Sequence, residues 1–315
     1  MGAGDDLINY FDYTTRNGGY TGINGSIHGY GLIDMGFGND RLRSYQLTNY
    51  SLGVINLGDG NDLLNVFSFA NHGKVYLGAG DDKAWLGTGF NNANTGLIDL
   101  GSGSDSFTIG SGTTTGSNYG VIIAGLDNEA DRDFITGIQY SLATGLPAAS
   151  TGDGLRNSGF IATGGGSDVI TGQGTNAAYG INNSGIIRLE SGDDVITDVV
   201  SEEIDGTTLD YSVLASYKGI VNTGVVDLGT GNDLVRAYTL GGTGTWNGGD
   251  GIDKLSLGKD GTYVVSAVSG GYSINGSGIY TGFEMIGSWN SSSTLILNEG
   301  YYTIENGGGY ISFST

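Results

Sequence analysis

The chain has no cysteine, one proline and two histidines among its 315 residues, and only 14% of its residues are charged. Without cysteine there are no disulfide bonds and no thiolate metal sites, so any metal would have to be bound through oxygen. No apolar run approaches the roughly 20 residues of a membrane-spanning helix. Nor does a basic and then apolar leader precede the opening residues MGAGDD. We therefore expect no membrane span, and either a fragment or a protein exported without an N-terminal signal.

Glycine and acidic residues are abundant by contrast. The 62 glycines occur with almost no proline and without a G-X-Y period, which excludes collagen. Hydrophobic residues make up 38% of the chain and recur in short runs rich in Val, Ile, Leu and Tyr, which favours strands over disorder. The net charge of -21 argues against nucleic acid or an anionic membrane as a partner and favours cations.

A short motif, G-x-G-x-D, returns along most of the chain between apolar runs, as in GLIDMGFGNDRL (31–42) and GVVDLGTGNDLV (224–235). Every copy ends in Asp, whereas the residue before it varies through Asp, Asn, Ser, Arg and Ile. A plain turn would tolerate Asn or Ser at the last position as well. Successive copies are 20 to 39 residues apart, and their aspartates are Asp6, Asp40, Asp62, Asp82, Asp105, Asp133, Asp168, Asp194, Asp233 and Asp253.

Each repeat has the same order of parts. An Asn-x-Gly turn, as at Asn157, Asn183 and Asn222 and also at Asn94-Thr95-Gly96, precedes a short strand with alternating apolar residues, and the G-x-G-x-D turn and a second strand follow. Period-two alternation marks strands with one buried face. One repeat cannot bury that face alone, so stacked parallel coils are expected. The sequence predicts an all-β, parallel β-solenoid (β-roll or β-helix) with one such turn per coil of about 20 residues. Loop insertions are expected at 11–29, 141–156 and 198–218.

The stacked aspartates would form a column of carboxylates about 4.8 Å apart. Neighbouring charges at that spacing repel by roughly 3 kcal/mol at an effective dielectric constant near 20. Glycines let backbone carbonyls crowd inward, and carbonyl and carboxylate oxygens are the ligands that calcium prefers. We expect several Ca²⁺ ions at Gly2, Gly4, Asp6, Gly36, Gly38, Asp40, Gly58, Gly60, Asp62, Gly78, Gly80, Asp82, Gly101, Gly103, Asp105, Asp133, Gly164, Gly166, Asp168, Gly192, Asp194, Gly229, Gly231, Asp233, Gly249, Gly251 and Asp253.

The segment GGDGIDKLS (248–256) fits the calcium-binding nonapeptide G-G-x-G-x-D-x-U-x at every defined position. The chain therefore resembles RTX (haemolysin-type) repeat proteins over about residues 1–258 and, more loosely, cyanobacterial surface proteins of the oscillin type. The RTX resemblance implies calcium held between turns of successive coils by glycine carbonyls and the Asp carboxylate. It also implies folding driven by extracellular calcium, and often type I secretion.

Three departures from the RTX pattern qualify this interpretation. The far side of each coil carries Asn-x-Gly, which predicts calcium along one edge only. Glu190 replaces the first glycine of the Asp194 copy, and an insertion at 127–132 interrupts the Asp133 copy, whose metal site is therefore doubtful.

The sequence indicates less about the function of the protein than about its fold. Residues 1–258 are interpreted as calcium-binding repeats and 259–315 as metal-poor terminal coils or a β cap. The chain begins at a turn and ends on a first-strand pattern (309–313), so either the molecules stack head to tail or a longer protein is cut within a coil.

No motif pairs a nucleophile with an acid and base, so we expect no enzyme. The expected role is secreted, extracellular and structural, in surface assembly. The alternative is part of an exported adhesin or carbohydrate-active protein, with surface polysaccharide as the partner. Ice binding would need a regular Thr/Asn array on an outer face.

Overall fold

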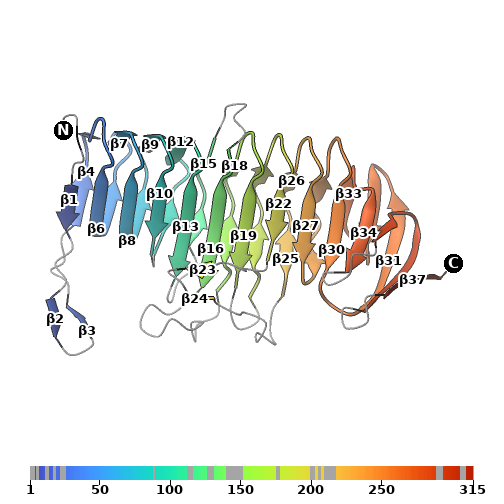
Figure 1. The fold of residues 1–315 in the computed structure, drawn as a ribbon. Coiled ribbons are helices and arrows are strands. Elements are labelled where there is room, and N and C mark those ends of the chain that lie inside the picture. Colours follow the sequence, from blue (N-terminus) through green and yellow to red (C-terminus); the bar gives the residue numbers. More distant parts are fainter. Residues whose placement is uncertain are drawn as a thin grey trace.

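The computed structural model describes residues 4, 7–10, 14–16, 19–21, 26–87, 89–111, 116–125, 131–139, 152–174, 178–198, 203–204, 207–208, 218–288, 294–305 and 310–314. Over these ranges the chain is all-β and contains no helix, hence none long and apolar enough to cross a membrane. Its coils follow one another in chain order along a rod (Figure 1). The predicted parallel β-solenoid is confirmed.

Two large sheets form the walls of the rod. The first has 19 strands: β1 (Leu7–Tyr10), β4 (Ser26–Gly29), β6 (Arg41–Asn49), β8 (Leu63–Asn71), β10 (Lys83–Leu86), β11 (Asn91–Asn92), β13 (Ser106–Ser111), β14 (Ser117–Asn118), β16 (Phe134–Gln139), β17 (Leu155–Asn157), β19 (Val169–Gln173), β20 (Ile181–Asn183), β22 (Val195–Thr197), β25 (Ile220–Asn222), β27 (Leu234–Ala237), β28 (Leu240–Gly241), β30 (Lys254–Leu257), β34 (Met285–Ser288) and β35 (Thr294–Ile296).

The second sheet has 14 strands: β5 (Leu32–Asp34), β7 (Val54–Asp59), β9 (Lys74–Ala79), β12 (Leu97–Ser102), β15 (Val121–Ile123), β18 (Phe160–Ala162), β21 (Ile186–Arg188), β26 (Val225–Asp227), β29 (Thr245–Asn247), β31 (Gly261–Val268), β32 (Gly271–Ile274), β33 (Ser277–Thr281), β36 (Gly300–Glu305) and β37 (Tyr310–Ser314). Two hairpins lie outside these sheets, β2 (Thr14–Arg16) with β3 (Gly19–Thr21) and β23 (Glu203–Ile204) with β24 (Thr207–Thr208).

Each coil contributes three strand segments. One lies in the 14-stranded sheet, and the aspartate turn joins it to two segments of the 19-stranded sheet. In β6 and β8 those two segments are one nine-residue strand; in later coils they are separate strands, such as β10 and β11. The third segment of each coil therefore extends the 19-stranded sheet and does not form a separate sheet.

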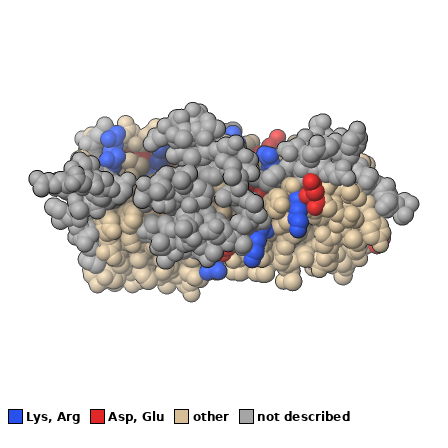
Figure 2. Space-filling view, turned by 90° about the horizontal axis from the view of Figure 1, so that it is seen from below, with Lys and Arg blue, Asp and Glu red and all other residues tan. Residues whose placement is uncertain are grey.

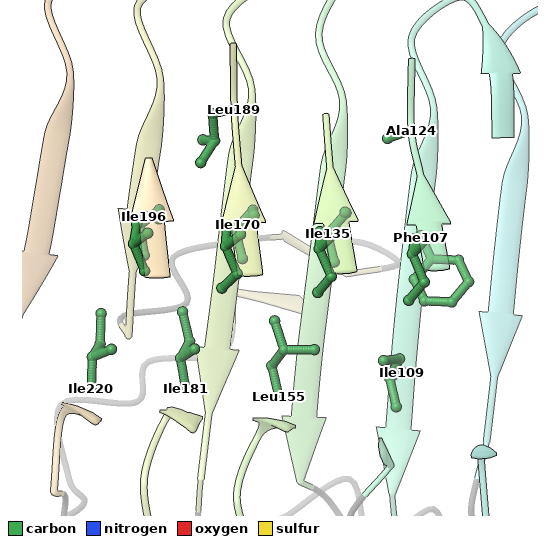
Figure 3. Close-up of a cluster of buried hydrophobic side chains, with 14 of the residues drawn as sticks. Phe107, Ile109, Ala124, Ile135, Leu155, Ile170, Ile181, Leu189, Ile196 and Ile220 are labelled. Carbon is green, nitrogen blue, oxygen red and sulfur yellow. The ribbon is translucent and has the colours of Figure 1, made fainter. Parts of the chain in front are cut away.

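The core is a set of apolar rows that follow the parallel register from coil to coil. Ile135 pairs with Ile170, and Ile170 with Ile196, so that their side chains lie one behind another (Figure 3). The alternating apolar residues expected from sequence, such as Ile55 and Leu57, are fully buried. Burial of each such side chain contributes roughly 1.5–3 kcal/mol, and no coil could obtain it alone.

The predicted insertions fall largely outside the described residues. The parts outside are 11–13, 17–18 and 22–25 of the first insertion, 141–151 of the second, and 199–202, 205–206 and 209–217 of the third. Residues 127–130 of the insertion before Asp133 also lie outside the described residues. The coils on either side of each insertion keep the same register, as the pairing of β22 with β27 shows. The insertions therefore leave the column of turns intact.

The C-terminal section departs from the parallel pattern. β33 still pairs in parallel with β29, but β31, β32, β36 and β37 pair antiparallel with their neighbours, and so does β35 with β34. The run at 309–313, expected to be the first strand of a further coil, instead contributes β37, which lies antiparallel to β36. The alternation of apolar residues is the same in both pairings, so the sequence did not distinguish them.

Candidate metal site along one edge

The aspartates of the G-x-G-x-D turns lie in one line along the rod. Nine of them are described and all are at most 2% exposed; we call them the aspartate column: Asp40, Asp62, Asp82, Asp105, Asp133, Asp168, Asp194, Asp233 and Asp253. Asp6 and Gly2 lie outside the described residues, whereas Gly4 is described and its N–H donates to the carbonyl of Phe37 over 2.7 Å. The predicted alignment of these carboxylates is confirmed for all nine.

Each column carboxylate is held by the coil before it. The backbone N–H of one aspartate donates to Oδ1 of the next over 2.7–2.9 Å, from Asp40 through to Asp253. At the last step the N–H of Asp253 donates to Oε2 of Glu284 over 2.8 Å, so Glu284 continues the column. The sequence signal for Glu284 was its place before Met285, because Met285 pairs with Lys254, the residue that follows Asp253.

The second carboxylate oxygens, Oδ2, do not accept these backbone N–H groups. In the part of the chain that the structure describes, Oδ2 is buried without a hydrogen-bond partner in eight members of the column: Asp62, Asp82, Asp105, Asp133, Asp168, Asp194, Asp233 and Asp253. An ionised oxygen without a partner at a buried position is costly. Each of these eight aspartates therefore offers one unsatisfied oxygen.

Burial dominates the acid–base behaviour of the column. Desolvation raises the pKa of Asp62 to about 6, of Asp82 to about 7 and of Asp105 to about 9; the N–H of the preceding aspartate opposes the rise, and neighbouring carboxylates add to it. The same causes raise the pKa of Asp194 to about 8 and that of Asp233 to about 7. Without a cation, several of these groups would be protonated near neutral pH.

The glycines of the motif are required for two separate reasons, their backbone conformation and their close contact with the neighbouring coil. Those before the column have φ of +93° to +148°, a left-handed conformation that disfavours other residues. They also touch the next coil: a Cβ on Gly192 would lie 1.4 Å from the carbonyl oxygen of Gly166, and one on Gly251 would lie 1.5 Å from that of Gly231. The glycine carbonyls thus point from coil to coil beside the carboxylates.

Two copies depart from this arrangement. Glu190, in place of the first glycine of the Asp194 copy, keeps the left-handed conformation with φ of +79°. In the Asp133 copy, Asp131 stands where the second glycine should be, and its Oδ2 accepts the N–H of Gly103 over 3.1 Å. The insertion leaves the Asp133 carboxylate in the column, but the turn before it has one glycine fewer.

The residue before each column aspartate forms an outer, exposed series. Asp81 accepts the N–H of Ser104 with its Oδ1 over 3.0 Å, and Asn39 accepts that of Asn61 over 2.7 Å. These bonds run in the opposite direction to those of the column. Each turn thus pairs a buried inner carboxylate with an exposed outer residue.

The opposite edge carries a structure that the sequence interpretation missed. Seven buried asparagines form what we call the asparagine ladder, in which Nδ2 of each of the first six donates to Oδ1 of the next over 2.8–2.9 Å: Asn49, Asn71, Asn92, Asn118, Asn157, Asn183 and Asn222. Each also donates to a backbone carbonyl, as Asn118 does to that of Phe160 over 3.2 Å. The Asn-x-Gly turns were interpreted only as turns, although their fixed Asn was the available signal.

One predicted Asn-x-Gly turn, Asn94-Thr95-Gly96, is a turn in the structure, but its Asn is not a member of the ladder. In the segment Asn92–Gly96 the ladder member is Asn92 and not Asn94, because this turn has two more residues than those at Asn157 and Asn183. The edge opposite the aspartates is thus filled by paired amides.

Backbone carbonyls and carboxylates together, and not side chains alone, make this edge suitable for a hard cation. Among the described residues no group of three or more His, Cys, Asp or Glu side chains could hold a metal by itself. Calcium takes six to eight oxygens, and backbone carbonyls commonly supply several of them. The unsatisfied Oδ2 atoms, which lie beside closely stacked glycine carbonyls, are oxygen ligands of the kind that calcium requires.

Comparison of the chain with protein-family models, with curated proteins and with solved structures found no match.

Proposed function

We propose that this protein is an extracellular calcium-binding repeat protein in which Ca²⁺ binds between successive coils along the aspartate column and stabilises the solenoid for a structural role at the cell surface. The observation that carries the proposal is the row of eight buried Oδ2 atoms without a partner among the described residues. Column carboxylates such as Asp82 and glycine carbonyls such as that of Gly60 would be the ligands. The bound ions would neutralise the stacked charges.

The extracellular setting follows from the chemistry of the site. Sites built from carbonyls and one carboxylate per coil have few charged ligands, and such sites suit the millimolar calcium found outside cells. The turn at Gly249, Gly251 and Asp253 also carries the full RTX-like nonapeptide, with both glycines in the left-handed conformation.

A metal-free role for the column is the second candidate, and a specific contact favours it. Every Oδ1 from Asp62 to Asp253 already accepts a backbone N–H from the coil before it. Protonated aspartates could form such a ladder without calcium, since burial raises their pKa. The column would then serve the fold in the same way as the asparagine ladder.

Head-to-tail assembly is the less supported part of the surface role. It would require matching open strand edges at the two ends, and the last described strand, β37, lies antiparallel to its neighbour β36. We therefore place the emphasis on stabilisation of the rod by calcium, and polymer formation remains a subsidiary proposal.

The decisive experiment is a thermal melt followed by circular dichroism in EGTA and in millimolar calcium, with magnesium as the control cation. Each site filled to 100 times its Kd adds about 2.7 kcal/mol, so several sites would raise Tm strongly in calcium and weakly in magnesium. Equal Tm values in calcium and EGTA would leave the metal-free ladder as the function of the column.

A further inference from the structure

Charge is separated between the walls of the rod. In the first segment of the 19-stranded sheet, the positions that alternate with the core residues form two rows, which run from Leu7 in β1 and Arg43 in β6 to Met285 and Gly287 in β34. The first row is exposed or half-buried, whereas Thr136, Thr171, Thr197 and Ser256 of the second are buried. These two rows contain five of the chain's Lys and Arg residues and no Asp or Glu, although the chain has 33 acids: Arg41, Arg43, Lys83, Arg236 and Lys254.

The acids occupy other surfaces. The outward row of the 14-stranded sheet includes Asp34, Asp99 and Asp227, and the aspartate turns add the outer series with Asp81 and Asp193. Figure 2 shows the underside of the rod, where Lys and Arg side chains are spaced among uncharged residues and a few Asp or Glu side chains. The outer face of the 19-stranded sheet is thus the basic face of a strongly acidic molecule.

Aromatic rings adjoin the bases on this face. Three neighbouring strands, β6, β8 and β10, carry a set that we call the basic-aromatic patch: Arg41, Arg43, Tyr45, Phe67, Lys83 and Trp85. The rings of Tyr45 and Phe67 are stacked, with centroids 4.8 Å apart and planes 10° apart. Each of the six side chains is exposed or half-buried.

The register places these groups side by side. Arg41 and Lys83 both pair with Leu63, so they flank it on neighbouring strands; Arg43 and Trp85 both pair with Asn65 and flank it in the same way. Among the described residues none of the three bases forms an ion pair. The patch therefore has donors and positive charge available for a ligand.

We propose that the basic-aromatic patch binds an acidic polysaccharide, a linear glycan that carries uronic acid groups. Guanidinium groups pair with carboxylates in two parallel hydrogen bonds, and aromatic faces pack against the apolar faces of sugar rings. Neighbouring parallel strands lie 4.7–4.9 Å apart, so the patch groups on β6, β8 and β10 are spread along the rod axis, which suits an extended polymer. The patch would attach the rod to a surface matrix.

Charge complementarity selects this occupant over other polyanions. Three bases without acid partners attract a thin, moderately charged chain, while the net charge of -21 opposes the much denser charge of DNA or of an anionic bilayer. The patch lies on a wall and does not share residues with the aspartate column, so the inference does not depend on calcium as a ligand of that column.

The test uses the full chain in 2 mM calcium, about the extracellular level, with hyaluronan as the probe and carboxyl-reduced hyaluronan as its neutral counterpart. Affinity is measured by isothermal titration calorimetry, after circular dichroism has shown that each variant is folded. The variants are Arg43→Gln, Lys83→Gln and Trp85→Ala. The matched control is Lys74→Gln, which removes the same charge from an exposed position on the other sheet.

We expect hyaluronan to bind. Carboxyl reduction, Arg43→Gln and Lys83→Gln should each weaken binding about tenfold because they remove one side of a charge-assisted contact, and Trp85→Ala should weaken it about tenfold because it removes an aromatic face. A tenfold change corresponds to about 1.4 kcal/mol. Lys74→Gln should leave the affinity unchanged. The inference is overturned if hyaluronan does not bind, if Lys74→Gln weakens binding as much as Lys83→Gln, or if duplex DNA or phosphatidylserine vesicles bind at least as tightly.

Discussion

The backbone N–H of Asp105 donates to Oδ1 of Asp133 over 2.8 Å although 28 residues separate the two aspartates. The same bond spans 20 residues between Asp62 and Asp82 and 39 residues between Asp194 and Asp233, with lengths of 2.7 and 2.8 Å. The contact is therefore set by the stacked turns and is independent of what the chain does between them. Its chemistry can be tested one residue at a time.

Replacing Asp82 by Asn should have effects of opposite sign in the two metal conditions. Asn keeps an oxygen that can accept the N–H of Asp62, but it removes the buried charge and the anionic ligand. In millimolar calcium we expect a loss of about 1–3 kcal/mol in unfolding free energy from the weakened site. In EGTA at pH 8 we expect equal or greater stability, because a buried amide costs less than a buried carboxylate.

The matched control for this substitution is Asp81→Asn, measured by urea denaturation in the same buffers. Asp81 is exposed, and Asn occupies the corresponding position in the copies at Asn39 and Asn61. It should change stability by less than about 0.5 kcal/mol in either condition. If Asp82→Asn behaved like Asp81→Asn in calcium, Asp82 would not be a ligand.

Adding one methyl group at Gly192 should be severe. Its Cβ would lie 1.4 Å from the Gly166 carbonyl oxygen, and its φ of +136° is itself unfavourable for alanine. We expect Gly192→Ala to lose about 3 kcal/mol or more. Gly241→Ala, where the added Cβ meets nothing within 4 Å, should stay within about 0.5 kcal/mol of the parent. Similar urea midpoints for the two variants would contradict the close stacking of the turns.

Glu190 should be a position where the protein can be made more stable. It adopts φ of +79° at a place where the other copies have glycine, and a left-handed conformation costs a residue with a Cβ about 1–2 kcal/mol. Glu190→Gly should recover about 1 kcal/mol of unfolding free energy. Glu190→Ala removes the charge but retains the Cβ, so it should give no such gain. A gain from alanine equal to that from glycine would show that charge, and not backbone strain, was relieved.

Substitutions in the asparagine ladder should depend on position. Asn118 lies within the ladder, so Asn118→Ala leaves one of the two Nδ2 hydrogens of Asn92 without an acceptor and removes the amide donor to Oδ1 of Asn157. Asn92 Nδ2 then keeps only its bond to the Val121 carbonyl, and Asn157 Oδ1 keeps only the N–H of Gly159. Asn49 begins the ladder, and its Oδ1 is already unpaired among the described residues because Gly29 occupies the corresponding place in the coil before it. An unsatisfied buried group costs about 1–3 kcal/mol, so Asn118→Ala should cost that much more than Asn49→Ala. Equal losses in urea denaturation would contradict a continuous ladder.

Asp198 provides a pH test away from the column. It is buried, both of its carboxylate oxygens accept the N–H of Tyr238, and burial raises its pKa to about 8. Between about pH 4 and pH 8 the folded state then holds a proton that the unfolded state releases, so rising pH removes stability. In EGTA, raising the pH from 5 to 8 should lower the Tm of the parent more than that of Asp198→Asn. Parallel pH profiles would mean that Asp198 stays ionised.

Much of the architecture was predictable because the coil repeats itself. Alternating residues such as Ile55 and Leu57 indicated one buried face, and the constant Asp indicated that every copy occupies an equivalent place. Period-two alternation does not encode strand direction, so the antiparallel β37 was mistaken for the first strand of a coil. Nor does a turn motif say which of its polar groups is buried: Asn94 fits Asn-x-Gly, yet Asn92 lies in the ladder. The metal content stays a prediction, since oxygen geometry alone does not determine whether a proton or a cation satisfies Oδ2.

The ladders at the two edges have a consequence for the length of the molecule. Each coil offers the same donors to the coil after it and the same acceptors to the coil before it, so removing residues 62–81 would bring Asp40 to Asp82 with no new kind of contact. The aspartate, glycine and asparagine contacts between neighbours would be reproduced by any whole number of coils. A gene encoding such a chain could therefore gain or lose coils by unequal recombination without a compensating mutation elsewhere.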